Sequence, residues 1–136
     1  QDPFSSLNPT RRIGSQMVEA LRLALRLPER GATERAIELL AEVDIPDPAA
    51  KLRMYPHELS GGMRQRVMLA IAMGAKPRLL IADEPTTALD TTTQAQILQL
   101  LRRVKDDNES SILLVSHDFG VIAEMCDDVA VMYDGY

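Results

Sequence analysis

Two adjacent carboxylates and one histidine follow the most apolar runs in the second half of the sequence. Asp83 and Glu84 come directly after the run LLIA at residues 79–82, and His117 comes shortly after the run ILLV at residues 112–115. Parallel sheets place ligand sites beyond the carboxyl ends of their strands, so we expect the three side chains at one edge. Carboxylates there can hold Mg²⁺ and orient water. The alternatives are a carboxylate that only caps a turn or helix and a histidine with a purely structural role.

A second candidate site lies upstream, in LSGGMRQRV at residues 59–67. Ser60, Gly61 and Gly62 stand directly before a predicted helix, and glycines allow a ligand to approach the backbone closely. The N-terminus of a helix offers free N–H groups and the positive end of the helix dipole, so a phosphate would fit there. An ordinary N-cap followed by flexible glycines is the simpler alternative for these residues alone.

The first part of the sequence predicts helices. Apolar residues recur at helical spacing within residues 13–27 and again within residues 36–43. Proline and glycine separate the two segments, and further prolines follow the second. We therefore expect residues 10–58 to form a small helical subdomain without strands.

The second part alternates between strand-like and helix-like segments. The apolar runs at residues 79–82, 112–115 and 129–132 resemble parallel strands buried on both faces. Helical patterns lie between them, and Thr91 or Thr92 could cap the first of these helices. This alternation predicts an α/β layered domain.

Composition narrows the class of protein. With 136 residues, 46% hydrophobic and 26% charged, the chain fits at most one globular domain with a core, and no apolar run approaches the roughly 20 residues that span a bilayer. A net charge of −5 argues against a general nucleic-acid-binding surface. The single cysteine, Cys126, excludes an intramolecular disulfide and favours a reducing compartment, by default the cytosol. We interpret Cys126 as a small buried hydrophobic residue.

Taken together and in order, LSGGM, LLIADEP, TALD at residues 87–90 and LLVSHD at residues 113–118 resemble the motifs of the ABC ATPase family. Gln1 resembles the glutamine of the family's Q-loop, so the resemblance extends over the whole chain. It implies an α/β fold, in which a partial P-loop NTPase (RecA-like) parallel sheet is joined to an α-helical ABC subdomain. It assigns the Q-loop, helical subdomain and signature helix to residues 1–75, and the Walker B, D-loop and H-switch motifs to residues 76–136.

The resemblance implies nucleotide contacts for the signature motif. Ser60, Gly61 and Gly62 would meet the γ-phosphate of an ATP molecule held by the opposite subunit. Met63 stands where the common form of the motif has glutamine, a departure familiar in the peptide-importer branch. Asp90, in the D-loop, would help to link the two ATP sites across the dimer.

The resemblance also implies a hydrolytic site. Asp83 would belong to the Mg²⁺ shell, and Gln1 would approach the Mg²⁺ and the water. Glu84 would polarise the attacking water, and His117 would contact the γ-phosphate and help to hold Glu84. ATP and Mg²⁺ are therefore the implied cofactors.

The sequence contains no G-x-x-x-x-G-K-[ST] stretch, the loop that cradles the β- and γ-phosphates and that precedes the Q-loop in this family. We therefore expect the chain to be truncated at its N-terminal end, and its last residues, VMYDGY, suggest the same for the C-terminal end. By itself the chain is expected neither to hydrolyse ATP nor to bind it tightly.

QDPFSSLNP at residues 1–9 and YPHELSGGMRQRV at residues 55–67 resemble the ATPases of oligopeptide and dipeptide importers. The implied partners are a second ABC ATPase subunit, identical or different, transmembrane permease subunits contacted through Gln1 and residues 10–58, and indirectly a solute-binding protein. No nucleic acid is expected. The implied location is the cytoplasmic face of the bacterial inner membrane, as a peripheral subunit.

Two other classes of protein are alternatives. A soluble ABC protein of the translation or DNA-repair type would use the same ATP chemistry, although the short helical segment without sustained heptads disfavours the repair type. A non-catalytic interaction module would keep the cassette only as a dimerisation surface, and the intact Glu84 and His117 argue against it.

Overall fold

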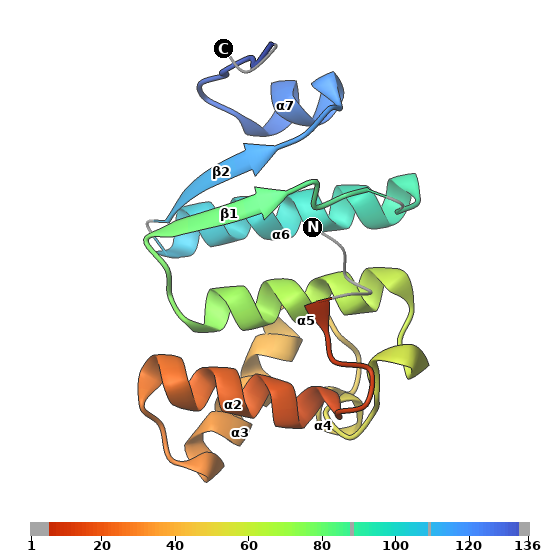
Figure 1. Ribbon diagram of the computed structural model, residues 1–136, viewed down its shortest axis with the longest axis vertical. Coiled ribbons are helices and arrows are strands. Elements are labelled where there is room, and N and C mark those ends of the chain that lie inside the picture. Colours follow the sequence, from red (N-terminus) through yellow and green to blue (C-terminus); the bar gives the residue numbers. More distant parts are fainter. Residues whose placement is uncertain (1–5, 88, 109, 134–136) are drawn as a thin grey trace.

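The computed structural model describes residues 6–87, 89–108 and 110–133 (Figure 1). The strands lie in the upper part of the molecule together with α6 and α7, the helices α2, α3 and α4 lie in the lower part, and α5 lies between them. In chain order the elements are α2 (Ile13–Leu25), α3 (Glu29–Glu42), α4 (Pro48–Lys51), a 3₁₀ turn η1 (Pro56–Glu58), α5 (Gly61–Gly74), β1 (Leu79–Asp83), α6 (Thr91–Asn108), β2 (Ser111–Val115) and α7 (Phe119–Met125).

The N-terminal helices confirm the predicted helical region without strands at residues 10–58. The first helix ends at Leu25, two residues earlier than expected, because Arg26 adopts a left-handed backbone conformation with φ of 55°. The second helix begins at Glu29, directly after Pro28 at the N-cap. This is earlier than the apolar pattern at residues 36–43 indicated. Both helices bury their apolar stripes against each other and against α5.

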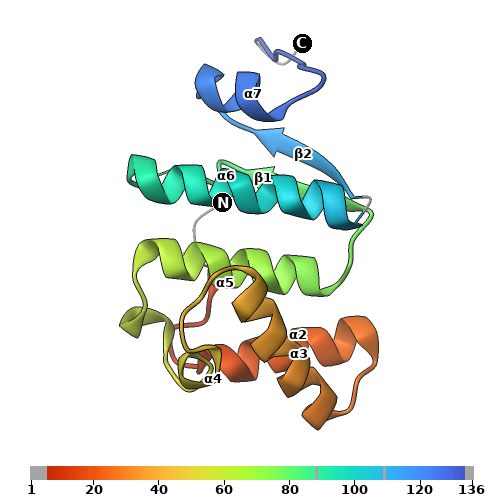
Figure 2. The ribbon, with the colours of Figure 1, turned by 180° about the vertical axis from the view of Figure 1, so that it is seen from behind.

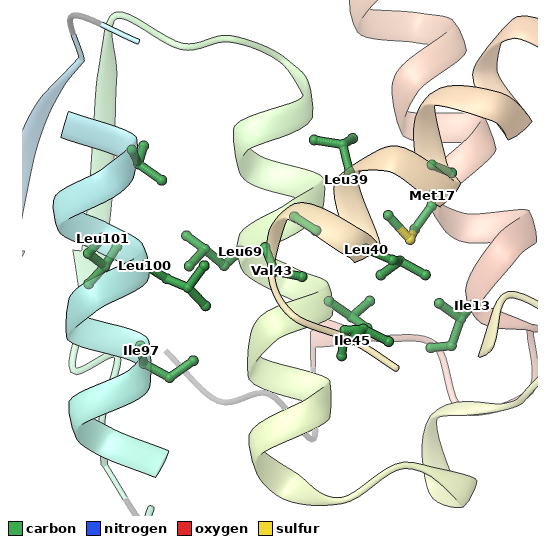
Figure 3. Packing of buried hydrophobic residues seen from close by; sticks show 14 of the residues in the cluster. Ile13, Met17, Leu39, Leu40, Val43, Ile45, Leu69, Ile97, Leu100 and Leu101 are labelled. Carbon is green, nitrogen blue, oxygen red and sulfur yellow. The ribbon is translucent and has the colours of Figure 1, made fainter. Parts of the chain in front are cut away.

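One hydrophobic cluster extends from the helical part into the α/β part (Figure 3). Leu69 of α5 lies between Val43, at the end of α3, and Leu100 of α6. Leu69 is buried and packs against side chains of both parts, so α5 belongs to the hydrophobic core of the helical part and of the α/β part.

The two strands pair in parallel, with Leu79 opposite Ser111 and Asp83 opposite Val115. The prediction that the segments around residues 79–82 and 112–115 are neighbouring parallel strands is confirmed. The intervening helix α6 is the crossover that a parallel pair requires, and it lies against one face of the sheet (Figure 2).

The expectation that these strands are buried on both faces is wrong. Leu79 is 53% exposed, Ile81 is 62% exposed and Leu113 is 52% exposed, whereas Leu80 and Ala82 on the other face of β1 are buried. Side chains alternate between the two faces of a strand. In the part of the chain that the structure describes, helices cover only one of these faces.

The apolar run at residues 129–132 is not a strand, contrary to prediction. Its residues lie in irregular structure, and Val129, Val131 and Met132 are 59%, 78% and 81% exposed. A strand needs a neighbour for its hydrogen bonds, and β1 and β2, the strands among the described residues, pair only with each other.

Two smaller expectations also need correction. Asp90, rather than Thr91 or Thr92, supplies the capping side chain of α6, because its carboxylate accepts hydrogen bonds from the backbone and hydroxyl of Thr93. Cys126, expected to be buried, is a free thiol at the C-terminal end of α7 that is only partly buried. Among the described helices, none is long and apolar enough to cross a membrane.

Candidate functional site

Glu84 is presented by a sharp turn at the end of β1. Its backbone N–H donates to the carbonyl of Val115 at 2.9 Å, which extends the parallel ladder by one residue. Its φ of 46° is left-handed, a conformation that costs a residue other than glycine about 1–3 kcal/mol and that is concentrated at functional sites. The turn directs the chain away from the sheet and leaves the carboxylate at the edge.

Two side chains contact this carboxylate. Nδ1 of His117 lies 3.0 Å from Oε1 of Glu84, and the hydroxyl of Thr87 donates to Oε2 at 2.8 Å. Both carboxylate oxygens are thus engaged, while 77% of the His117 side chain remains exposed and available to another group. We predicted that Asp83, Glu84 and His117 cluster beyond the carboxyl ends of the two strands. This is confirmed for Glu84 and His117, whose side chains are in contact, whereas Asp83 takes no part in that contact.

These contacts favour the ionised form of Glu84. The hydrogen bond with His117, followed by that from Thr87, lowers the pKa of Glu84 below its ordinary value. A carboxylate that is ionised at neutral pH and anchored at both oxygens can accept a proton from a water or orient it. Thr87 was not assigned a role from the sequence, and its position in TALD was the only signal that could have pointed to it.

Asp83 ends β1 beside this cluster and is partly buried. Within residues 6–87, 89–108 and 110–133, no three His, Cys, Asp or Glu side chains gather to form a metal site. Mg²⁺ in phosphate-transfer sites is commonly held by one or two carboxylates together with phosphate oxygens and waters. A single carboxylate at the strand end fits that type of donor set, so Asp83 could hold Mg²⁺ when a phosphate ligand completes the shell.

The N-terminus of α5 is a second candidate site, separate from the strand edge. The Ser60 hydroxyl accepts from the backbone N–H of Met63 at 3.3 Å, which makes Ser60 the N-cap of this 14-residue helix. No acceptor for the N–H groups of Gly61 and Gly62 lies in the described part of the chain. A Cβ built on Gly61 would meet nothing within 4 Å, so this end is open to a ligand.

The signature glycines lie close to the start of α6. A Cβ on Gly62 would lie 2.6 Å from Cγ2 of Thr93, so glycine is needed for this approach. Thr93 in turn donates from its hydroxyl and backbone to Asp90, and these bonds lower the pKa of Asp90. Among the described contacts, none joins Ser60, Gly61 or Gly62 directly to Glu84 or His117. Gln1 lies outside the described residues.

The amino-acid sequence matches a known protein family. Residues 1–87 match the sequence model of the family described as ABC transporter. The chain belongs to the ABC transporter family. This confirms the resemblance inferred from the signature, Walker B, D-loop and H-switch motifs.

Curated members of the family are similar along almost the whole chain. It is 55% identical to a putative peptide import ATP-binding protein of Brucella abortus strain 2308, over 99% of this chain and 41% of that protein. It is 52% identical to the oligopeptide transport ATP-binding protein OppD of Bacillus subtilis strain 168, over 99% of this chain and 38% of that protein. For the dipeptide transport ATP-binding protein DppD of the same organism, the identity is 48%, over 99% and 40%. The chain thus spans about two fifths of the length of these relatives.

Solved ABC transporter structures share the fold. The dimeric structure of the bacterial ABC transporter cassette MJ0796 superposes with a TM-score of 0.73 at 30% identity, over 85% of this chain and 50% of that one. A post-hydrolysis state of the same cassette, bound to ADP and Pi, gives a TM-score of 0.71 at the same identity and coverage. The predicted fold class, a partial P-loop NTPase sheet with an α-helical ABC subdomain, is confirmed.

Proposed function

We propose that the parent protein, meaning the full-length protein that contains these 136 residues, is the ATP-binding and ATP-hydrolysing subunit of an ABC importer. It couples hydrolysis to the uptake of peptides or related small solutes across the cytoplasmic membrane. The observation that carries the proposal is the Glu84–His117 contact of 3.0 Å at the carboxyl edge of a parallel strand pair. The import and transport names of the relatives support the choice of an importer over a soluble ABC protein.

In this proposal each residue at the strand edge has a distinct task. Glu84, ionised and anchored by Thr87, accepts a proton from or orients the attacking water. His117 holds one oxygen of Glu84 and keeps most of its ring exposed toward the γ-phosphate. Asp83 and Gln1 hold Mg²⁺, which supplies charge neutralisation on the phosphates when it is bound.

The second half of the proposed site acts on the nucleotide of a partner subunit. The open N-terminal end of α5, formed by Ser60, Gly61 and Gly62, offers backbone N–H groups to the γ-phosphate of that ATP. Asp90 is hydrogen-bonded to Thr93, which packs against Gly62 at this end of α5, and in the proposal Asp90 links the two ATP sites. The dimeric state of the structurally similar cassette supports a homodimer or heterodimer of ABC ATPase subunits.

The remaining partners are transmembrane permease subunits and, indirectly, a solute-binding protein. A shallow groove along α2 supports a permease contact in the helical region. Arg22 and Arg26 line it, and Leu23 within it is 79% exposed. We place the parent protein peripherally at the cytoplasmic face of the membrane, with residues 1–75 as the coupling part and residues 76–136 as part of the nucleotide-binding core.

The test is hydrolysis and uptake by the parent protein. Purified parent protein, reconstituted with its permease, is expected to release phosphate from ATP only when Mg²⁺ is present. Cells that lack the gene are expected to lose uptake of labelled di- or oligopeptides. Magnesium-dependent hydrolysis with undiminished uptake of peptides, sugars and nickel in those cells would contradict the importer assignment and favour a soluble ABC protein.

A further inference from the structure

One hydrogen bond connects the signature helix directly to the turn that presents Glu84. The side-chain amide of Gln65, in the second turn of α5, donates from Nε2 to the carbonyl of Pro85 at 2.8 Å. Pro85 is buried and immediately follows Glu84, whose left-handed φ of 46° depends on the path of this turn. The bond spans 20 positions in the sequence and joins two elements that carry different proposed tasks.

The bond is costly to break because of its surroundings. Pro85 and Gln65 both line a cavity of about 110 Å³ between α5, β1 and α6, whose other lining residues are mainly apolar. A buried carbonyl that loses its donor there also loses access to most of its solvation, and such a group is expensive to leave unpaired. The half-buried Gln65 side chain is the donor that the described residues supply to it.

A second contact holds the same end of α5 against the start of α6. The approach of Gly62 to Thr93 leaves no room for a Cβ, and Thr93 is itself fixed by two bonds to Asp90. Movement of the first turns of α5 toward α6 is therefore blocked. The Gln65–Pro85 hydrogen bond connects these first turns of α5 to the turn that contains Glu84. A shift of α5 would therefore also shift the Glu84 turn.

We propose that Gln65 is a positioning residue, which ties the Ser60–Gly62 end of α5 to the conformation of the Glu84 turn. The inference rests on the proposed function, in which Ser60–Gly62 contact the ATP of the opposite subunit and Glu84 acts on the ATP of its own. Occupation of one site then sets the geometry of the glutamate at the other, through one helix and one hydrogen bond within the same chain.

The test compares Gln65→Leu with the matched control Gln99→Leu in the parent protein. Gln99 is exposed on α6 and lies outside the proposed site. Hydrogen–deuterium exchange of peptides covering residues 79–90 is measured first, because the amide of Glu84 donates to Val115 on β2 and the amide of Thr87 donates to the carbonyl of Glu84 within the turn. We expect about 2- to 10-fold faster exchange in Gln65→Leu, the effect of losing one net hydrogen bond, and no change in the control.

ATP hydrolysis by the same variants gives the functional readout. Gln65→Leu is expected to lower kcat by about 2- to 10-fold with little change in KM for ATP, because Glu84 is misplaced while ground-state binding is retained. Gln65→Lys, which keeps an N–H donor, is expected to restore most of both readouts. Should the leucine variant fail to fold, Gln65→Glu removes the donor while keeping the shape.

Unchanged exchange in the donor-free variant overturns the proposal, and so does faster exchange without a loss of kcat. A kcat loss that Gln65→Lys does not restore also counts against it. If the unchanged parent protein hydrolyses no ATP, the proposed function fails, whereas the exchange comparison still decides whether Gln65 holds the Glu84 turn.

Discussion

At the scale of single residues, the position of Glu84 is set by a small number of contacts. The carboxylate is bound by His117 and Thr87, and its backbone is held by Val115 in a left-handed turn. None of these partners is a direct neighbour in the sequence. Substitutions that keep the size of the side chain but remove one interaction therefore separate binding from chemistry.

Glu84→Gln in the parent protein should bind ATP but hydrolyse it slowly. The amide keeps the size of the side chain and loses the charge that orients water, and a positioned base is commonly worth about 10²–10⁴-fold in rate. We expect kcat to fall by at least about 100-fold, with ATP affinity retained in a filter-binding assay. Steady-state hydrolysis close to that of the unchanged protein would mean that another residue fills this role.

Thr87→Val should shift the pH dependence of hydrolysis. The hydrogen bonds from His117 and Thr87 lower the pKa of Glu84, so the ionised form persists as the pH falls and is lost only below the ordinary range. Removing the Thr87 hydroxyl raises the pKa of Glu84 toward its ordinary value. The acid limb of the kcat profile, recorded from about pH 3.5 to pH 7 so that it includes the ordinary range of a glutamate pKa, should therefore move to higher pH. The control is Thr86→Val; an unmoved limb in Thr87→Val would show that Thr87 does not tune Glu84.

At the scale of elements, α5 is the connection between the two halves of the molecule. Beyond Gln65, the helix carries Arg66, whose side chain is only 11% exposed. Arg66 donates to the carbonyls of Val43 and Asp44, at the C-terminal end of α3, and to the side chain of Gln96 on α6. A cation at a helix C-terminus also interacts favourably with the helix dipole.

Arg66→Met should destabilise the parent protein by about 2 kcal/mol, because two backbone carbonyls and an amide oxygen lose a charged donor. The control is Arg30→Met, since the Arg30 side chain is 92% exposed and, among the described residues, pairs with Glu34 one turn away, a pair worth about 0.5 kcal/mol or less. Urea unfolding of both variants measures the difference. Equal midpoints would show that the Arg66 contacts contribute little to the junction.

At the scale of the whole molecule, the sheet has one covered face and one exposed face. Leu79, Ile81 and Leu113 form an apolar patch on the exposed face. Contiguous exposed apolar patches promote association between molecules. The chain expressed on its own should therefore self-associate through this face.

Ile81→Lys combined with Leu113→Lys should reduce self-association of the 136-residue chain, because two charges would interrupt the patch. Leu23→Lys is the control, since Leu23 is 79% exposed and belongs to α2, a helix that lies apart from the two strands in Figure 1. Sedimentation velocity at several concentrations measures the association state. Equal association of the double variant and the control would place the contact elsewhere.

The amino-acid sequence by itself determined the helical region, the parallel strand pair and the clustering of Glu84 with His117. These follow from local periodicity and from the rule that parallel strands end at one edge. The tertiary structure alone decided that residues 129–132 form no strand, that one face of the sheet is exposed and that Asp90 caps α6. It also revealed Thr87 and Gln65 as partners of the Glu84 turn. The Gln65–Pro85 and His117–Glu84 contacts join residues 20 and 33 positions apart, and burial and hydrogen bonding at such distances depend on which elements meet in space.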